Sequence, residues 1–260
     1  MTIRHIYGNL YEADYESSTH SKQVIYFITE NNRVLLIDTG YEAEMEQLKA
    51  YFYEKSLIID KVIITHYHED HFSGLKALKK SVNNITVLGS SEFKRTLAIE
   101  YPDDFLHDSD IYPSVFCDNY EFRYGGHNIR FEKAPGHSYC SVHTIIDDSY
   151  VHVGDNLLFD TMNKAMLPLP YMSINEHIRT LEQLKGHLDK YFLGSHFSFE
   201  INKLKNRETE IDGRIAYLKL IPECNSNVEY DSIKDLFPIE FNPRWHNLIL
   251  GFCEEQRAQM

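Results

Sequence analysis

The chain contains little of what disulfide-stabilised or membrane-spanning proteins need. Its 260 residues include only 4 cysteines, and no two of them form a Cys-x-x-Cys pair. We therefore expect no disulfide framework and assign the protein to the reducing cytoplasm. No apolar run approaches the roughly 18–20 residues of a membrane-spanning helix. The first residues show no basic segment followed by an apolar one, so the sequence predicts no secretory signal.

Basic charge is scarce as well. The chain has 26 Lys and Arg residues against 39 Asp and Glu residues, which gives a formal net charge of −13. Such a field repels phosphate backbones, so the sequence favours a small-molecule substrate over nucleic acid or a membrane as partner. Bound metal ions would add positive charge that this count omits. The sequence leaves open whether the chain forms a homodimer.

The remaining composition is that of an ordinary globular protein, with 43% hydrophobic and 25% charged residues. This length accommodates one large domain, or one domain with an appendage. We predict a main domain over residues 1–200 and a helical extension over residues 201–260, where the pattern changes to helices around a polar stretch. The predicted strands cover residues 3–11, 24–29, 34–37, 62–64, 85–88, 120–124, 129–132, 142–146, 150–153 and 191–194. The predicted helices cover residues 42–55, 91–100, 174–188, 204–220 and 244–256, and another begins near residue 72.

One segment of the main domain fits neither pattern. Residues 101–119 are acidic, contain two prolines and carry the aromatic residues Phe105, Tyr112 and Phe116. A long irregular segment inside a compact domain is usually functional or disordered. The aromatic residues favour an ordered lid.

The densest chemical signal is the run His66-Tyr67-His68-Glu69-Asp70-His71. Imidazole nitrogens and carboxylate oxygens are ordinary ligands of zinc and neighbouring transition metals. The run follows an apolar β-branched stretch that predicts a buried strand, and open sheets place their sites in loops at the carboxyl ends of strands. The alternative is a solvated, histidine-rich turn. We interpret the run as part of a metal site.

Five separated motifs, each at the end of a predicted strand, carry a resemblance to a known family. They are Leu36–Gly40, His66–His71, Ala134–Ser138, Val153–Asp155 and Leu193–His196. In this order they resemble the metallo-β-lactamase superfamily of metallohydrolases over residues 24–196. The resemblance implies the α/β class, with a four-layer αββα sandwich and a site at one edge between its two sheets. Residues 1–200 would form the catalytic domain.

The resemblance also implies a site for two divalent transition metals, zinc first, with iron or manganese as alternatives. His66, His68 and His137 would hold one metal, whereas Asp70, His71 and His196 would hold the other. Asp155 would bridge them beside a shared water or hydroxide. Asp38, assisted by Thr65, resembles the family's aspartate that orients the histidine-rich loop. Asp70 would in addition receive or shuttle a proton as a catalytic residue.

The function implied by the resemblance is metal-dependent hydrolysis of a small ester-like bond by the bridging hydroxide, with a thioester or lactone as the favoured substrate. Departures from the family pattern narrow this choice. Most β-lactamases of this fold lack a bridging aspartate, which argues against antibiotic hydrolysis. Residues 156–162 lack the Gly-Cys-Gly-Arg segment of glutathione-specific members, which argues against glutathione recognition. Gly194-Ser195-His196-Phe197 replaces the usual Gly-His-Gly.

Three other functions stay open at this point. A mononuclear iron dioxygenase of the same fold would use His66, His68 or His137, together with Asp155. A phosphodiesterase would use the same two metals. A non-catalytic sensor on a hydrolase scaffold would retain the fold alone.

The segment after Asp155 predicts the substrate pocket. It carries apolar residues that include Phe159, Met162, Met166 and Tyr171, whereas Lys164 is its only basic residue. We predict a pocket for an apolar or aromatic acyl group rather than a polyanion. The lid aromatics from residues 101–119 would close over it. The alternative is that these side chains only fill the core behind the site.

Overall fold

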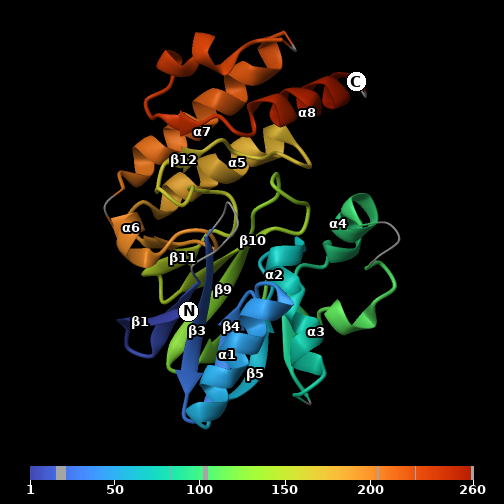
Figure 1. Ribbon diagram of the computed structural model, residues 1–260, viewed down its shortest axis with the longest axis vertical. Helices are drawn as coiled ribbons and strands as arrows, with labels where there is room; N and C mark the ends of the chain where they lie inside the picture. Colours follow the sequence, from blue (N-terminus) through green and yellow to red (C-terminus); the bar gives the residue numbers. More distant parts are fainter. Residues whose placement is uncertain (16–21, 83, 102–104, 204, 226, 259–260) are drawn as a thin grey trace.

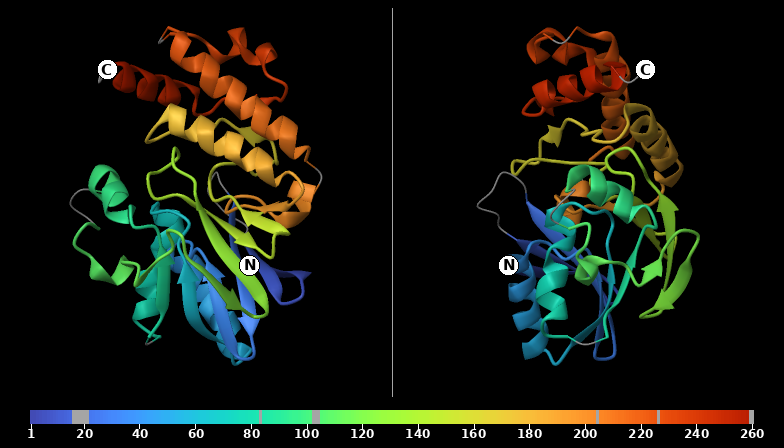
Figure 2. Two further views of the ribbon diagram at one scale, coloured as in Figure 1. Left: turned by 180° about the vertical axis from the view of Figure 1, so that it is seen from behind. Right: turned by 90° about the vertical axis from the view of Figure 1, so that its right-hand side faces the viewer.

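The computed structural model describes residues 1–260 except 16–21, 83, 102–104, 204, 226 and 259–260. Two β-sheets face each other, and helices cover the outer face of each sheet (Figure 1). The N-terminal helices lie at one end of the molecule, and the C-terminal helices gather at the other (Figure 2). No helix in the described part of the chain is long and apolar enough to cross a membrane.

The first sheet has seven strands in sequence order, β1 to β7. The β1–β4 neighbours pair antiparallel, and β4 to β7 run parallel. Its strands are β1 Thr2–Tyr7, β2 Leu10–Tyr15, β3 Gln23–Glu30, β4 Arg33–Ile37, β5 Ile58–Ile63, β6 Thr86–Gly89 and β7 Val115–Phe116. The prediction of one strand over residues 3–11 is wrong. Gly8, at φ +57°, takes a left-handed conformation, and the chain turns there into a β1–β2 hairpin.

Helices pack against the outer face of this sheet. They are α1 Glu42–Glu54, α2 Glu69–Phe72, α3 Gly74–Lys79 and α4 Phe93–Glu100. Alternate residues of β3 point to opposite sides, as the two-residue period of a strand requires. Ile25 and Phe27 pack in the cluster that includes Met45 of α1, whereas Val24 and Tyr26 pack between the sheets. Both faces of β3 are therefore buried.

The second sheet has the strand order β13-β11-β10-β9-β8. Its strands are β8 Glu121–Tyr124, β9 His127–Lys133, β10 Val142–Ile146, β11 Tyr150–His152 and β13 Tyr191–Leu193. Its outer face shares an apolar cluster with α5 Ile174–Leu184 and α7 Arg207–Leu220. Helix, sheet, sheet and helix thus form four layers. The predicted αββα sandwich is confirmed.

The last sixty residues pack closely against the rest of the chain. Helices α6 Phe199–Lys203, α7 and α8 His246–Ala258 belong to this part, and several short 3-10 turns connect them. Strand β14 Phe241–Asn242 pairs in parallel with β12 Ala165–Met166, two short strands that the sequence did not predict. Arg214 of α7 is fully buried and donates to the Leu158 carbonyl oxygen at 2.7 Å. The division of the chain near residue 200 stays a prediction, whereas the contact between its two parts is extensive.

Candidate metal centre

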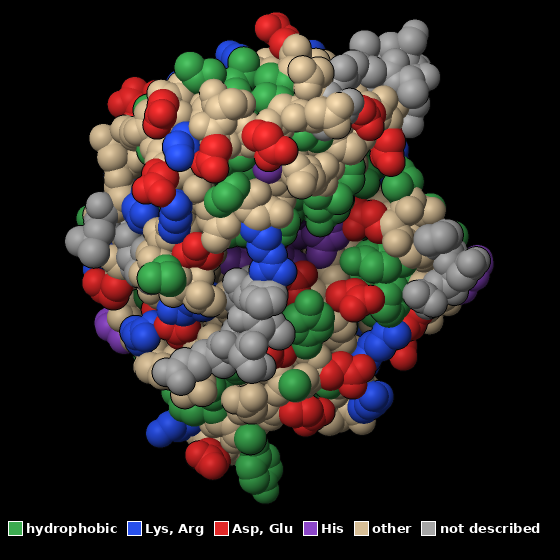
Figure 3. All heavy atoms as spheres, turned by 45° about the horizontal axis from the view of Figure 1, so that its top comes forward, with side chains coloured by type: hydrophobic (Ala, Val, Ile, Leu, Met, Phe, Trp, Pro, Cys, Tyr) green, Lys and Arg blue, Asp and Glu red, His purple; other side chains and the backbone are tan. Residues whose placement is uncertain are grey.

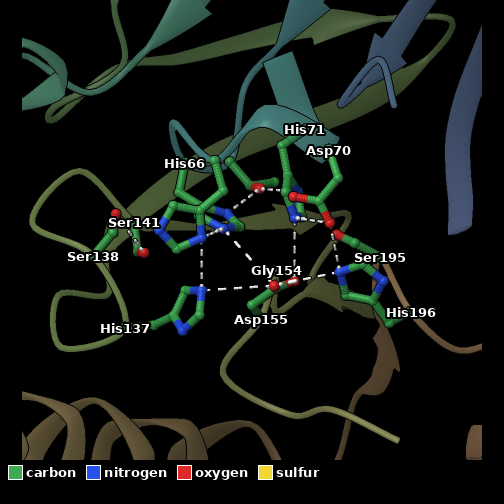
Figure 4. Close-up of polar contacts among 12 residues, drawn as sticks. His66, Asp70, His71, His137, Ser138, Ser141, Gly154, Asp155, Ser195 and His196 are labelled. Carbon is green, nitrogen blue, oxygen red and sulfur yellow. Dashed lines mark hydrogen bonds and ion pairs between the residues drawn. The ribbon is translucent and has the colours of Figure 1, made fainter. Parts of the chain in front are cut away.

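Seven polar side chains from five loops converge at one edge of the sandwich (Figure 4). The histidine-rich run follows β5 and forms the start of α2, so its backbone leaves the sheet where the strand ends. His137 lies between β9 and β10, Asp155 follows β11, and His196 follows β13. The structure therefore brings together all of the predicted ligand positions, although they span 131 residues of sequence from His66 to His196.

The first cluster consists of His66, His68, His137 and Asp155, and one donor atom of each lies within 4.8 Å of the others. His68 Nδ1 is 3.0 Å from His66 Nε2 and 3.1 Å from His137 Nε2. The Asp155 carboxylate is 3.6 Å from His137 and 3.8 Å from His66. Three imidazole nitrogens and one carboxylate oxygen facing a common point are a suitable donor set for a divalent transition metal.

The second cluster consists of Asp70, His71 and His196. His196 Nε2 lies 3.2 Å from the Asp70 carboxylate and 3.3 Å from that of Asp155. His71 Nε2 lies 3.4 Å from the other Asp155 oxygen, Oδ1. Asp155 therefore stands between the two clusters, with one side toward His137 and the other toward His71 and His196 (Figure 4).

Two atoms in this region test whether metal ions fit the site. His71 Nε2 and Asp155 Oδ1 are buried, and neither has a hydrogen-bond partner among the described residues. Buried polar atoms are almost always satisfied, because leaving one unpaired costs about 1–3 kcal/mol. A cation between them would satisfy both atoms. The donor set and these two atoms therefore fit a metal at the second cluster.

The outer nitrogen of each of five histidines is also anchored. His137 Nδ1 lies 2.9 Å from the Leu169 carbonyl oxygen, and His196 Nδ1 lies 2.6 Å from that of Lys22. His66 Nδ1 is 3.1 Å from the Thr65 hydroxyl. Such contacts fix the ring orientation and leave the inner nitrogen free to ligate. The remaining two, on His71 and His68, involve carboxylates.

Asp38 anchors His71 and the start of the histidine-rich loop. This fully buried carboxylate accepts from the Thr65 amide and the Thr65 hydroxyl, each at 2.8 Å, and lies 2.8 Å from His71 Nδ1. Ser195 also donates its hydroxyl proton to Asp38 at 3.2 Å. The serine that replaces a glycine of the family pattern thus contributes to the same network, a role that the sequence did not reveal.

Glu100, at the end of α4, anchors His68 and was missed in the sequence. Its carboxylate lies 2.6 Å from His68 Nε2, so Nδ1 is the nitrogen directed at the cluster. Its second oxygen is buried without a hydrogen-bond partner among the described residues. A helix-terminal glutamate thirty residues from the histidine run carries no motif, so no local pattern could have identified it.

The electrostatics divide the two clusters. Burial, together with the neighbouring histidines, lowers the pKa of His66 and lowers that of His137 to about 3. Burial opposes charge at His196 as well, yet Asp155 and Asp70 raise the pKa of His196 to about 10. Despite burial, His71 and His196 hold the pKa of the Asp70 carboxyl well below its usual range. The first cluster therefore offers neutral imidazoles, whereas the second offers carboxylates that stay ionised.

Gly136 fixes the loop that carries His137. Its φ of +130° lies in the left-handed half of backbone space, and a Cβ there would come within 2.3 Å of the His177 Cα. Only glycine allows this loop to rest against α5. The close approach holds His137 toward the first cluster, because its neighbour cannot move outward.

A cavity of about 340 Å³ opens beside both clusters. Histidine side chains are visible in a hollow near the middle of the face that Figure 3 shows. The lining residues outside the clusters are Tyr41, Leu158, Phe159, Met166, Leu169, Tyr171, Arg244 and Trp245. Of the predicted pocket residues, Phe159, Met166 and Tyr171 are therefore in place. Met162 is not, because its side chain lies in a turn and is 86% exposed.

The expected lid does not line the cavity in the described part of the chain. Phe105 packs with Phe72, and Tyr112 with Phe93, in the core cluster beneath α3 and α4. Phe116 is 54% exposed and lies near Phe93. The lid interpretation of these aromatics is corrected, because Phe72 and Phe93 provide apolar partners away from the metal clusters. Residues 102–104 of that segment lie outside the described residues.

Comparison with known proteins gives one family. The model of the metallo-beta-lactamase superfamily matches residues 19–196. A metallo-beta-lactamase from Pontibacter korlensis superposes with a TM-score of 0.61 at 15% identity, covering 78% of this chain and 99% of that one. This likeness concerns the fold alone.

Two relatives by sequence are similar over part of their length. "Glyoxylase B2" of Dictyostelium discoideum is 28% identical over 134 residues, which cover 49% of this chain and 45% of that protein. A hydroxyacylglutathione hydrolase of Salmonella paratyphi A is 25% identical over 186 residues, covering 60% of this chain and 70% of that protein. The chain thus spans less than half of the first relative's length.

Proposed function

Because the chain belongs to the metallo-beta-lactamase superfamily, we propose that it is a hydrolase that cleaves a small ester-like bond with two divalent transition metals. The observation that carries the proposal is the pair of side-chain clusters that share Asp155. We assign the first metal to His66, His68 and His137. We assign the second to Asp70, His71 and His196, with Asp155 contributing to both. Zinc is the first choice, and an oxygen-and-nitrogen donor set also accepts iron or manganese.

Bound metals of this kind supply Lewis acidity and lower the pKa of water toward neutrality. The chain's own residues would perform the remaining tasks. Asp70 lines the cavity, and its depressed pKa keeps it ionised at neutral pH, so it is placed to accept a proton. The Asp38 network with Thr65 and His71 would hold the loop rigid during turnover.

Thioesters are the substrate class that we favour, with lactones second. A relative is named hydroxyacylglutathione hydrolase, an enzyme name that refers to a thioester substrate. The chain lacks the glutathione-binding segment expected at residues 156–162, so we propose a thioester with a different carrier. Cytoplasmic location and a homodimer stay predictions from the sequence.

A mononuclear iron dioxygenase is the rival within this family. The second cluster of Asp70, His71 and His196 counts against it, because one metal would leave three convergent polar side chains without a role. A phosphodiesterase or a sensor without activity has no specific observation in its favour.

The decisive experiment combines metal analysis with a substrate panel. Protein purified without chelator should contain between about one and two equivalents of transition metal and should hydrolyse acyl thioesters faster than phosphodiesters. His196→Gln should lower the metal content and abolish turnover, whereas His5→Gln, at an exposed histidine on β1, should change neither. One iron per chain with no hydrolysis would favour the oxygenase. Protein that takes up no metal on addition would refute the proposal.

A further inference from the structure

The wall of the cavity opposite the metal clusters comes from outside the region that the family model matches. Arg244 and Trp245 line the cavity together with Asp70 and Asp155, yet they follow β14 and lie 48 residues or more beyond the matched range of 19–196. This part of the wall is therefore specific to the C-terminal extension. Its chemistry bears on which substrate the site accepts.

The segment that carries these two residues is held firmly. Pairing of β14 with β12 places Asn242 beside Met166, which is itself a cavity residue. The Asn242 side chain donates to Asp160 at 2.8 Å and accepts from the Arg244 amide at 3.1 Å. The amide of Ile249 donates to the Trp245 carbonyl oxygen at 3.0 Å, at the start of α8. These contacts fix the backbone of Arg244 relative to the loop that follows Asp155.

Arg244 is the only Lys or Arg among the described lining residues of the cavity. Its guanidinium has no acidic partner within ion-pair distance in the described part of the chain, although the chain carries a net charge of −13. Other arginines in this protein pair with carboxylates, such as Arg33 with Asp60 and Arg214 with Glu210. An arginine left without such a partner at a cavity wall is available to an anionic ligand, for which its planar fork is well suited.

Between this cation and the metal clusters the wall is mostly apolar. The side chains there are Leu158, Phe159, Met166, Leu169, Tyr171 and Trp245. An occupant that satisfies the whole cavity needs a reactive polar group at the clusters, an apolar middle and one anionic end. A single guanidinium suits a monoanionic carboxylate, because a phosphate dianion would lack a second cation among the described lining residues.

We propose that Arg244 and Trp245 form a carboxylate subsite, so that the substrate is an ester or thioester of an apolar acyl group that ends in a carboxylate. This inference rests on the proposed hydrolytic function and names its substrate class. It also refines the prediction from sequence, which excluded a polyanion and found only Lys164 as a basic residue near the pocket. One anionic end is compatible with a mainly apolar pocket.

Trp245 supplies the readout, since it is the only tryptophan of the chain. Its fluorescence reports occupancy of the cavity without any turnover. The metal-loaded protein is titrated with adipate, with the monoamide of adipate and with hexanoate, which share one carboxylate for the clusters and differ at the far end. Calorimetry of the same titrations supplies the affinities if the fluorescence change is small. Circular dichroism verifies that each variant is folded.

We expect adipate to bind at least about tenfold more tightly than its monoamide or hexanoate, as a charged hydrogen bond at a partly desolvated site allows. Arg244→Gln should remove this preference, and Arg244→Lys should retain part of it. Arg33→Gln, which removes the same charge from an exposed pair at the far end of β4, should leave it unchanged. Equal binding of the three ligands, or an unchanged preference in Arg244→Gln, would overturn the subsite. Tighter binding of 5-phosphonopentanoate than of adipate would overturn the choice of a carboxylate.

The failure of the hydrolytic proposal would look different. If no thioester is hydrolysed but the Arg244-dependent preference for adipate persists, the subsite stands and the reaction is wrong. If thioesters with carboxylate and methyl ends are hydrolysed with equal kcat/KM, and Arg244→Gln changes neither value, the reaction stands and the subsite is wrong.

Discussion

The two sides of the cavity are built in different ways. On the metal side, buried side chains follow directly after strands, and five histidines have their outer nitrogens anchored by hydrogen bonds. On the opposite side, an exposed arginine and a partly buried tryptophan come from a short connection before α8. The sandwich thus determines where chemistry takes place, and the added C-terminal segment determines what fits beside it. Changes on the first side should alter whether the protein reacts, and changes on the second should alter what it selects.

The largest effect is expected at Asp70, the point where the metal side meets the cavity. Asp70→Ala removes a ligand position and the proposed proton acceptor, so kcat should fall by about 10²–10⁴ or more. Metal content should drop toward one equivalent while the circular dichroism spectrum stays unchanged, because this side chain is 21% exposed and outside the apolar core. Glu69→Ala, at the exposed neighbouring carboxylate, is the matched control. Near-normal turnover in Asp70→Ala would remove Asp70 from the mechanism.

The next effect concerns the anchoring of His68. Glu100→Ala deletes the carboxylate that lies 2.6 Å from His68 Nε2, so the ring can rotate and change tautomer. Loss of such an outer partner typically lowers metal affinity by about 10–100-fold. Competition with a chelator measures the affinity, and the absorption spectrum of the cobalt-loaded protein should change as well. Glu100→Gln should recover part of the loss. Glu92→Ala, on the exposed side near the start of α4, should match the unmodified protein, and equal affinities for all variants would contradict the role of Glu100.

The contrast between the two sides also explains what the sequence could predict. The histidine run, His137, Asp155 and His196 each follow a predicted strand, and carboxyl ends of strands meet at one edge of a sandwich. The αββα fold follows from the same alternation of strand and helix. Arg244 and Trp245 could not be found, because only the pairing of β14 with β12 brings them to the cavity. Gly8 was overlooked as a turn signal within an otherwise regular strand pattern.

Local composition misled where a three-dimensional partner decides the outcome. Met162 has an apolar side chain like its neighbours, yet the backbone amides of Met162 and Lys164 both donate to the Asp160 carboxylate in a turn that directs Met162 to solvent. Phe105 belongs to an irregular segment, yet it finds Phe72 in the core. Aromatic or apolar content predicts burial or contact of some kind. It does not predict which cavity receives the side chain.

A smaller effect concerns stability in acid and lies behind the metal side. Burial, opposed by Glu132 and reinforced by His187 and His152, lowers the pKa of His143 to about 3. The unfolded chain therefore binds a proton near pH 6.5 that the folded chain refuses, so stability falls as the pH drops below about 6.5. At pH 5 this histidine should cost about 2 kcal/mol of unfolding free energy relative to pH 7.

His143→Gln tests this cost, because the glutamine oxygen can still accept from the Asn156 side chain, which now lies 2.9 Å from the imidazole. Denaturant unfolding at pH 7 and pH 5 is measured for both proteins. Subtracting the two pH dependences cancels the contributions of bound metal and of the other histidines. The variant should lose about 2 kcal/mol less between the two pH values, and parallel pH dependences would contradict the assignment.

The smallest effect per step belongs to the apolar middle of the cavity, and it distinguishes a substrate pocket from simple core filling. A series of acyl thioesters that differ by one methylene should gain about 0.8 kcal/mol per carbon, which is about fourfold in kcat/KM, until the cavity of about 340 Å³ is filled. Trp245→Ala should reduce the slope, because the methylenes lose part of the wall that removes them from water. Trp245 is only half-buried, so this change should leave the unfolding free energy nearly intact. A flat series in the unmodified protein would mean that Leu158, Phe159 and Leu169 support the fold and do not contact the acyl chain.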